Sequence, residues 1–257
     1  LALLQMRSYY HELNNIEIRL EEVIEWFFTE YLSSEFNARS FKINMPSSSS
    51  SFLEKCSTIA PAIESVLKQF TLFVQEGQID FELLEVKSEQ LIYKNIPTLV
   101  NKKYVYGFGN EYSSATYLLF SDQSGLGYTK KSKKEYSNFY ELVCNKNTKL
   151  NDYPEHCLSQ LDWLSSNKFI SVDNQNNISF NKRLILILKD LYFNEVISYW
   201  AYSESNRNLI ELLQEKGLVR FERSLFSKPE QDYINYTLNK SQFNNSLDLR
   251  NKYSHSQ

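Results

Sequence analysis

Three residues near the end of the chain are of the types that phosphodiester chemistry uses. Arg250, Asn251 and His255 lie within the stretch "LDLRNKYSH". On a helix, Asn251 and His255 share a face because they are four residues apart, so the amide can orient the imidazole. A histidine titrates near neutral pH and can act as general acid or base. A guanidinium stays charged and can hold two phosphate oxygens at once.

We therefore predict a catalytic cluster that acts on a phosphodiester and needs no metal. In this cluster His255 is the general base or acid, Arg250 clamps the phosphate and stabilises its extra charge, and Asn251 orients the imidazole. We expect no cofactor. Cys144, His156 and Cys157 lack a fourth ligand and the paired spacing of a zinc site, so no metal site is expected there.

The stretch resembles the signature of the HEPN superfamily (higher eukaryotes and prokaryotes nucleotide-binding). Its ribonuclease members carry Arg, then a polar residue that is often Asn, and His four to six positions after the Arg. Arg250, Asn251 and His255 match this signature position by position, and Ser256 stands where Gly is common. The resemblance implies a helical bundle and a metal-independent endoribonuclease with RNA as substrate. It also implies a toxin or an antiviral, abortive-infection effector.

The resemblance further implies a homodimer in which two copies of the motif form one cleft. We expect the 226–257 segments of two chains to approach each other, with Tyr233, Tyr236 and Phe243 serving the core or the interface. A regulatory protein partner is compatible with an effector of this kind. The chain begins with Leu rather than Met, which is compatible with a fragment of a larger polypeptide.

Composition narrows the class of protein. A chain of 257 residues with 42% hydrophobic residues can bury a substantial core. Basic and acidic residues nearly balance at 28 and 31, so any nucleic-acid contact should be local. Three cysteines without a CxxC pair indicate a reducing, cytoplasmic location. The apolar runs are too short to span a membrane, so no membrane partner is expected.

The sequence patterns predict a mainly α protein of the α-rich α+β class. Six glycines and five prolines are too few for a turn-rich β-sandwich, and three-four apolar spacing predicts helices over 3–32, 61–77 and 182–202. Pro61 is expected as the first helical residue. We expect 1–150 to be a helical region with a β-rich insert near 103–128, and 151–257 to lead from a winged-helix-like segment into HEPN-like helices.

The winged-helix-like segment supports a second hypothesis. Residues 155–200 read as helix, hairpin and helix, with the hairpin near 170–180 around an Asn-rich turn. A non-catalytic module that binds nucleic acid or protein is therefore the alternative to a ribonuclease. The "GFG" at 107–109 lacks the spacing of a phosphate-binding loop, and the basic run "KKSKKE" at 130–135 is either a solvated face or a phosphate contact.

Overall fold

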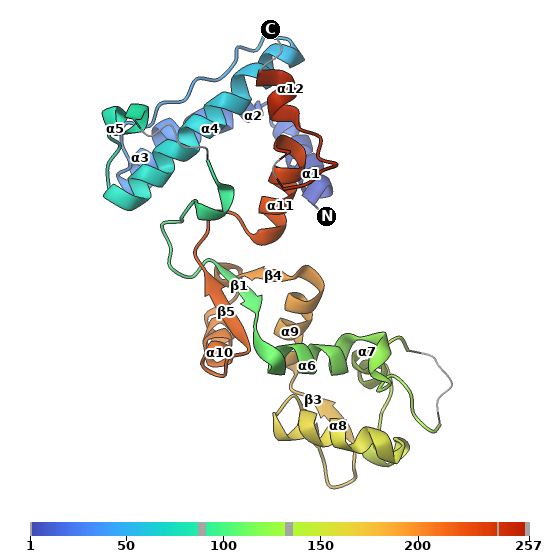
Figure 1. The fold of residues 1–257 in the computed structure, drawn as a ribbon. Coiled ribbons are helices and arrows are strands. Elements are labelled where there is room, and N and C mark those ends of the chain that lie inside the picture. The colour runs from blue at the N-terminus through green and yellow to red at the C-terminus, as the bar shows by residue number, and fades with distance from the viewer. Residues whose placement is uncertain (1, 87–90, 132–135, 241, 255–257) are drawn as a thin grey trace. The chain divides into compact units, whose positions relative to one another are not determined.

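The computed structural model describes residues 2–86, 91–131, 136–240 and 242–254, and helices dominate them, as the fold-class prediction requires. The strands form one three-stranded and one two-stranded sheet. The chain divides into two compact units, which we call unit 1 (Leu1–Leu99 with Ser224–Gln257) and unit 2 (Val100–Arg223) (Figure 1). The expected boundary near residue 150 falls inside unit 2, because the two ends of the chain build one unit together.

Unit 1 is a group of helices taken from both ends of the chain. Its helices are α1 (Ala2–Asn15), α2 (Leu20–Trp26), a π-helical turn (Phe27–Tyr31), α3 (Leu32–Phe36), α4 (Phe52–Glu76), α5 (Phe81–Val86), a short 3-10 helix (Tyr93–Asn95), α11 (Lys228–Leu238) and α12 (Leu249–Ser254). Val66, Leu67 and Phe70 of α4 form its core together with Leu32, Phe41 and Ile96. The long helix α4 thus contributes three of the buried core residues of unit 1.

The prediction of a single helix over 3–32 is wrong in detail, because the helix is interrupted between α1 and α2. Glu17 adopts a left-handed backbone with φ of 57°, which a helix cannot contain. The side chain of Glu22 then accepts hydrogen bonds from the backbone nitrogen and Nε of Arg19, at 3.1 and 2.9 Å. These bonds cap the start of α2, so the apolar periodicity continues across two separate helices.

The start predicted at Pro61 is also wrong, since α4 begins nine residues earlier in the chain, at Phe52. Ser51 and Glu54 form a reciprocal capping box in which each backbone N–H bonds the other side chain, at 2.7 and 3.3 Å. Pro61 lies inside the helix instead. The helix ends at Gly77, whose φ of 77° fits the predicted stop.

A buried glutamine ties an irregular segment to α4. The Gln69 side chain accepts from the backbone nitrogen of Lys42 and donates to its carbonyl, both at 2.8 Å. Gln69 thereby satisfies two backbone groups that have no helix or strand partner of their own. This pair of bonds holds the Ala38–Ile43 segment, with its buried Phe41, against the helix.

Unit 2 is organised around a short central strand. β1 (Tyr104–Gly107) pairs antiparallel with β4 (Val196–Ser198) on one side and with β5 (Val219–Glu222) on the other. Val105 is completely buried, as a central position requires. The α-helices of the unit are α6 (Gly109–Phe120), α7 (Phe139–Asn145), α8 (Glu155–Ser166), α9 (Lys182–Asn194) and α10 (Glu204–Glu215), and short 3-10 helices cover Asp122–Ser124, Leu150–Asp152 and Tyr199–Ala201.

The β-rich insert expected near 103–128 contains only β1 as an extended strand, and helix α6 follows it directly. Ala115, Leu118 and Leu119 are buried and lie at helical spacing. The prediction of strands relied on the many aromatic residues of this region and overlooked this spacing. The two glycines of "GFG" have structural roles, in packing at Gly107 and in backbone conformation at Gly109. A side chain at Gly107 would meet the Tyr112 ring at 2.1 Å, and Gly109 has a left-handed φ of 80°.

The predicted hairpin is confirmed as β2 (Ile170–Val172) and β3 (Ile178–Phe180), with Ile170 opposite Phe180. Asp173 shapes its turn by accepting from the backbone nitrogens of Gln175 and Asn177, each at 2.8 Å. The helix predicted over 182–202 is too long. It ends at Asn194 because Glu195 turns left-handed with φ of 64°, and β4 follows.

Helix α8, the β2–β3 hairpin and helix α9 follow one another along the chain, which is the order of helix, hairpin and helix that the sequence predicts. α9 then packs behind β1 and β4 (Figure 1). No helix in the described part of the chain has the length and apolar character needed to cross a membrane.

Two leucines of α9 provide a matched test of this arrangement. Leu188 is fully buried, whereas Leu186 is 51% exposed on the same helix. We expect Leu188→Ala to lower the free energy of unfolding by about 2–5 kcal/mol, because it leaves a cavity in the core. Leu186→Ala should cost less than about 1 kcal/mol. Urea unfolding, followed by the fluorescence of Trp163 and Trp200 in unit 2, measures both. Equal losses would contradict the packing of α9.

Candidate active site

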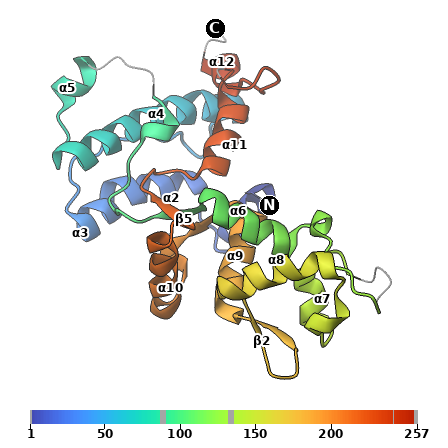
Figure 2. The same cartoon turned by 60° about the horizontal axis from the view of Figure 1, so that its bottom comes forward.

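Two residues of the predicted catalytic cluster, Arg250 and Asn251, lie on α12, a short helix that packs against α4 and α11 (Figures 1 and 2). Two hydrogen bonds fix its place. The backbone nitrogen of Leu247, just before α12, donates to the carbonyl of Tyr236 in α11 at 2.9 Å. The hydroxyl of Ser57 in α4 donates to the carbonyl of Tyr253 at 3.4 Å. α12 is therefore tied at its start to α11 and near its end to α4.

Arg250 reaches from α12 to α4 and forms an ion pair with Glu64. Its Nη2 lies 2.8 Å from Oε2 of Glu64, and the two side chains are 34% and 21% exposed. Lys68, one turn further along α4, lies 3.6 Å from the same carboxyl group. Glu64 thus stands between two cations, and it holds the guanidinium of Arg250 at a partly buried position.

Tyr93 lies close to this ion pair. Burial raises the pKa of its phenol, and the negative charge of Glu64 raises it further, while the charge of Arg250 acts in the opposite direction. A hydrogen bond with Asn239 also lowers the pKa of Tyr93. The phenol is consequently neutral at physiological pH and can serve as a hydrogen-bonding group beside Arg250.

The side-chain amide of Asn251 is bonded to Asp248, at the start of α12. Its nitrogen donates to both carboxylate oxygens of Asp248, at 2.9 and 3.1 Å. Asp248 has a left-handed φ of 50° immediately before the helix, which brings its charged group within reach of Asn251. The expected partner, His255, lies outside the described residues. The predicted pairing of Asn251 with His255 therefore stays a prediction.

The arrangement can present an anion-binding guanidinium at the surface. An arginine has five N–H donors, and one carboxylate leaves several of them for a second anion such as a phosphodiester. Glu64 restricts the rotamers of Arg250, which reduces the entropy lost when a phosphate binds. Its negative charge also weakens the attraction for a phosphate, so the ion pair both orients and moderates the site.

Sequence reasoning missed Glu64, Asp248 and Tyr93. Glu64 and Tyr93 are far from Arg250 in the chain, and only the packing of α12 on α4 and of α11 beside Tyr93–Asn95 brings them near. The role of Asp248 could have been predicted from the sequence, because an Asp directly before a helix commonly bonds a side chain or backbone nitrogen in the first turn.

The other sequence candidates do not form a second site. His11 and His156 are exposed on α1 and α8, and Cys157 is buried, which raises the pKa of its thiol. Among the residues that the structure describes, no three His, Cys, Asp or Glu side chains are grouped to hold a metal ion. In the basic run at 130–135, Lys131 pairs with Asp152 at 2.6 Å, and 132–135 lie outside the described residues.

The surface of α8 bears on the alternative hypothesis. A recognition helix that reads DNA presents basic and amide side chains to the bases and phosphates. α8 contains neither lysine nor arginine, and its exposed residues are Glu155, His156, Ser159, Asp162 and Ser166. Its two carboxylates would repel a phosphate backbone, so the surface of α8 does not favour contact with a nucleic acid.

The Arg250–Glu64 ion pair can be tested by a double-mutant cycle with Glu64→Gln and Arg250→Gln. We expect a favourable coupling energy of about 0.5–1 kcal/mol, because the pair is partly buried and well aligned. The pair Glu64–Lys68 on the same helix is the control, with an expected coupling below about 0.5 kcal/mol. Urea unfolding measures both cycles. A coupling of zero between Glu64 and Arg250 would contradict the described position of α12.

Comparisons of the chain with protein-family models, with curated proteins and with solved structures found no match. Inference about function therefore rests on the motif in the sequence and on the geometry around α12.

Proposed function

We propose that Arg250, Asn251 and His255 form a metal-independent endoribonuclease centre of the HEPN type, with Arg250 and Asn251 on α12. The observation that carries the proposal is the ion pair of Arg250 with Glu64, which holds a guanidinium at a third of its full exposure beside the motif that resembles the HEPN signature. A toxin or an antiviral, abortive-infection effector in the cytoplasm is the biological setting that the resemblance implies.

The proposed reaction is attack by the RNA on its own backbone. A general base removes the proton from a 2′-hydroxyl, the 2′-oxygen bonds to the adjacent phosphorus, and the bond to the 5′-oxygen breaks as a general acid protonates it. His255 takes one of these proton-transfer roles. Arg250 binds the non-bridging oxygens, whose charge increases in the transition state. The products are a 2′,3′-cyclic phosphate end and a 5′-hydroxyl end.

Each chain has one histidine in the motif, His255, whereas the reaction needs both a base and an acid. Two copies of the motif would supply both. A two-fold axis near α12 would place a second Arg250 and His255 at the same cleft. Tyr236 and Phe243 are half-buried and pack against each other within one chain, with ring centroids 6.1 Å apart. Tyr233, Leu247 and Tyr253 are exposed on or beside α11 and α12 and are the residues available for an interface.

Cleavage of RNA by the full-length protein tests the proposal directly. We expect His255→Ala to abolish cleavage, and Arg250→Ala to lower it by about two to four powers of ten, since charge stabilisation is lost. Arg250→Lys should recover little, because an ammonium cannot form two parallel hydrogen bonds. EDTA should have no effect, and DNA should resist. His11→Ala and Arg7→Ala alter exposed residues of α1 and serve as controls.

Activity that survives His255→Ala, or that EDTA removes, would reject the assignment. An inactive wild-type full-length protein would favour the partner-binding module instead. Circular dichroism of each variant separates loss of chemistry from loss of fold.

Association is a separate prediction. We expect a homodimer in light scattering, and we expect the paired substitution Leu247→Ser and Tyr253→Ser to dissociate it because both side chains are exposed and apolar in one chain. The same pair should lower the cleavage rate in proportion to the loss of dimer. Leu212→Ser, at an exposed leucine of α10 in unit 2, is the control. A monomer that cleaves RNA at the wild-type rate would exclude a shared cleft.

A further inference from the structure

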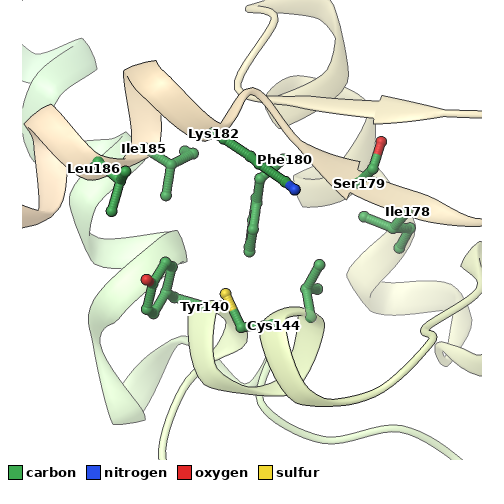
Figure 3. Close-up of a pocket in the computed structure, with 9 residues that line it drawn as sticks. Tyr140, Cys144, Ile178, Ser179, Phe180, Lys182, Ile185 and Leu186 are labelled. Atoms are coloured by element: carbon green, nitrogen blue, oxygen red, sulfur yellow. The ribbon is translucent and has the colours of Figure 1, made fainter.

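A hollow of about 460 Å³ opens on unit 2 between α7, β3 and α9. Its walls are mostly apolar, with Tyr140 and Val143 from α7, Phe180 from β3, and Ile185 and Leu186 from α9. Figure 3 shows the Tyr140, Phe180 and Leu186 side chains around this space, and the chain of Lys182 extending along its edge. Tyr140 and Phe180 stack with ring centroids 5.8 Å apart, so this part of the wall is preformed.

The hollow continues into a stripe along α9. Lys182, Leu186, Lys189 and Phe193 are spaced by four, three and four residues, which places them within an arc of about 60° on a helix. The stripe is about 16 Å long, equal to three helical turns. Leu186 and Phe193 are 51% and 59% exposed, although the opposite face of the same helix is buried in the core.

Aromatic residues extend the stripe at its C-terminal end. Phe193 and Tyr192 both pack on Phe120 of α6, with ring centroids 6.2 and 5.4 Å away. Tyr192 is itself exposed. Large apolar side chains therefore contact water at both ends of this surface, at Leu186 beside the hollow and at Tyr192 and Phe193. Clustered apolar side chains on a surface commonly mark a binding site.

Two cations alternate with these apolar side chains. Lys182 has no ion pair within the described residues, and Lys189 lies 4.7 Å above the Tyr140 ring. The acidic groups nearby have other partners: Glu141 accepts from the Ser137 hydroxyl at 2.6 Å, and Asp190 accepts from the Tyr202 hydroxyl at 2.6 Å. Lys189 also acts electrostatically on Glu141. The stripe thus presents a positive, apolar, positive, apolar pattern.

We propose that this surface, Lys182 to Phe193 of α9 with the adjoining hollow, binds an acidic amphipathic helix of a partner protein. Apolar side chains at every third or fourth position of that helix enter the hollow and cover Leu186 and Phe193. Its carboxylates, placed between them, pair with Lys182 and Lys189. The pattern of charge selects an acidic segment, and its length matches three turns. A nucleic acid is a poor fit, because exposed apolar side chains separate the only two cations of the stripe.

Selection of peptides by the whole chain tests the proposal without assuming a partner. A phage-displayed library of random 16-residue peptides is panned on the protein, and enriched sequences are synthesised. We expect enriched peptides to be acidic, with apolar residues at helical spacing. We expect Leu186→Ser and Lys182→Glu each to weaken binding by at least about tenfold. Lys216→Glu, at an exposed lysine next to α10, is the charge-matched control and should not weaken binding.

The two exposed cysteines locate the bound peptide. Cys144 lines the hollow, whereas Cys56 is in unit 1. A peptide bound on the stripe should slow the alkylation of Cys144 by iodoacetamide at least about threefold by covering it, and should leave Cys56 unchanged. Mass spectrometry of the digested protein follows both rates in one sample.

Four outcomes of the peptide experiments would overturn the proposal. These are enrichment of basic or uncharged peptides, no enrichment at all, retained binding by Leu186→Ser, and unprotected Cys144. A dimer in sedimentation that Leu186→Ser dissociates would identify a second copy as the occupant, and would overturn it too. The test does not involve Arg250 or His255, so its result is independent of the proposed ribonuclease activity.

Discussion

The pairing of β1 with β5 is the constraint on which the rest of the fold depends. Unit 2 interrupts unit 1, so the chain must leave unit 1 after Leu99 and return at Ser224. Antiparallel pairing lets the first strand of the insertion lie beside its last, with Val105 opposite Phe221 and the Lys103 nitrogen donating to the Glu222 carbonyl at 3.2 Å. Two segments more than a hundred residues apart are thereby held at one strand spacing.

In unit 1, the C-terminal helices α11 and α12 lie with helices from the N-terminal part of the chain, and α12 contacts α4. Within that unit the backbone nitrogen of Leu225 donates to the carbonyl of Ile96 at 2.7 Å, directly before α11 begins. α12 then packs on α4 and brings Arg250 to Glu64. A candidate site assembled in this way needs both ends of the chain, because neither end contains both partners of the ion pair.

Electrostatics distinguishes the two surfaces that we consider functional. At α12 a cation is held by a carboxylate and is only partly exposed, which suits a site that must orient a charge toward a substrate. On α9, Lys182 and Lys189 stand among exposed apolar side chains, which suits recognition of a larger amphipathic surface. The exposed surface of α8 carries carboxylates and no cations, which does not suit contact with a phosphate backbone.

The sequence by itself determined the local features: the mainly helical class, the hairpin around the Asn-rich turn and the helix stop at Gly77. These follow from periodicity, capping and turn chemistry, which act between near neighbours. Only the tertiary structure decided that Arg250 bonds Glu64 and that the ends of the chain form one unit. Such contacts join residues whose separation leaves no periodic signal, because packing and strand pairing select them from many sequence-compatible partners.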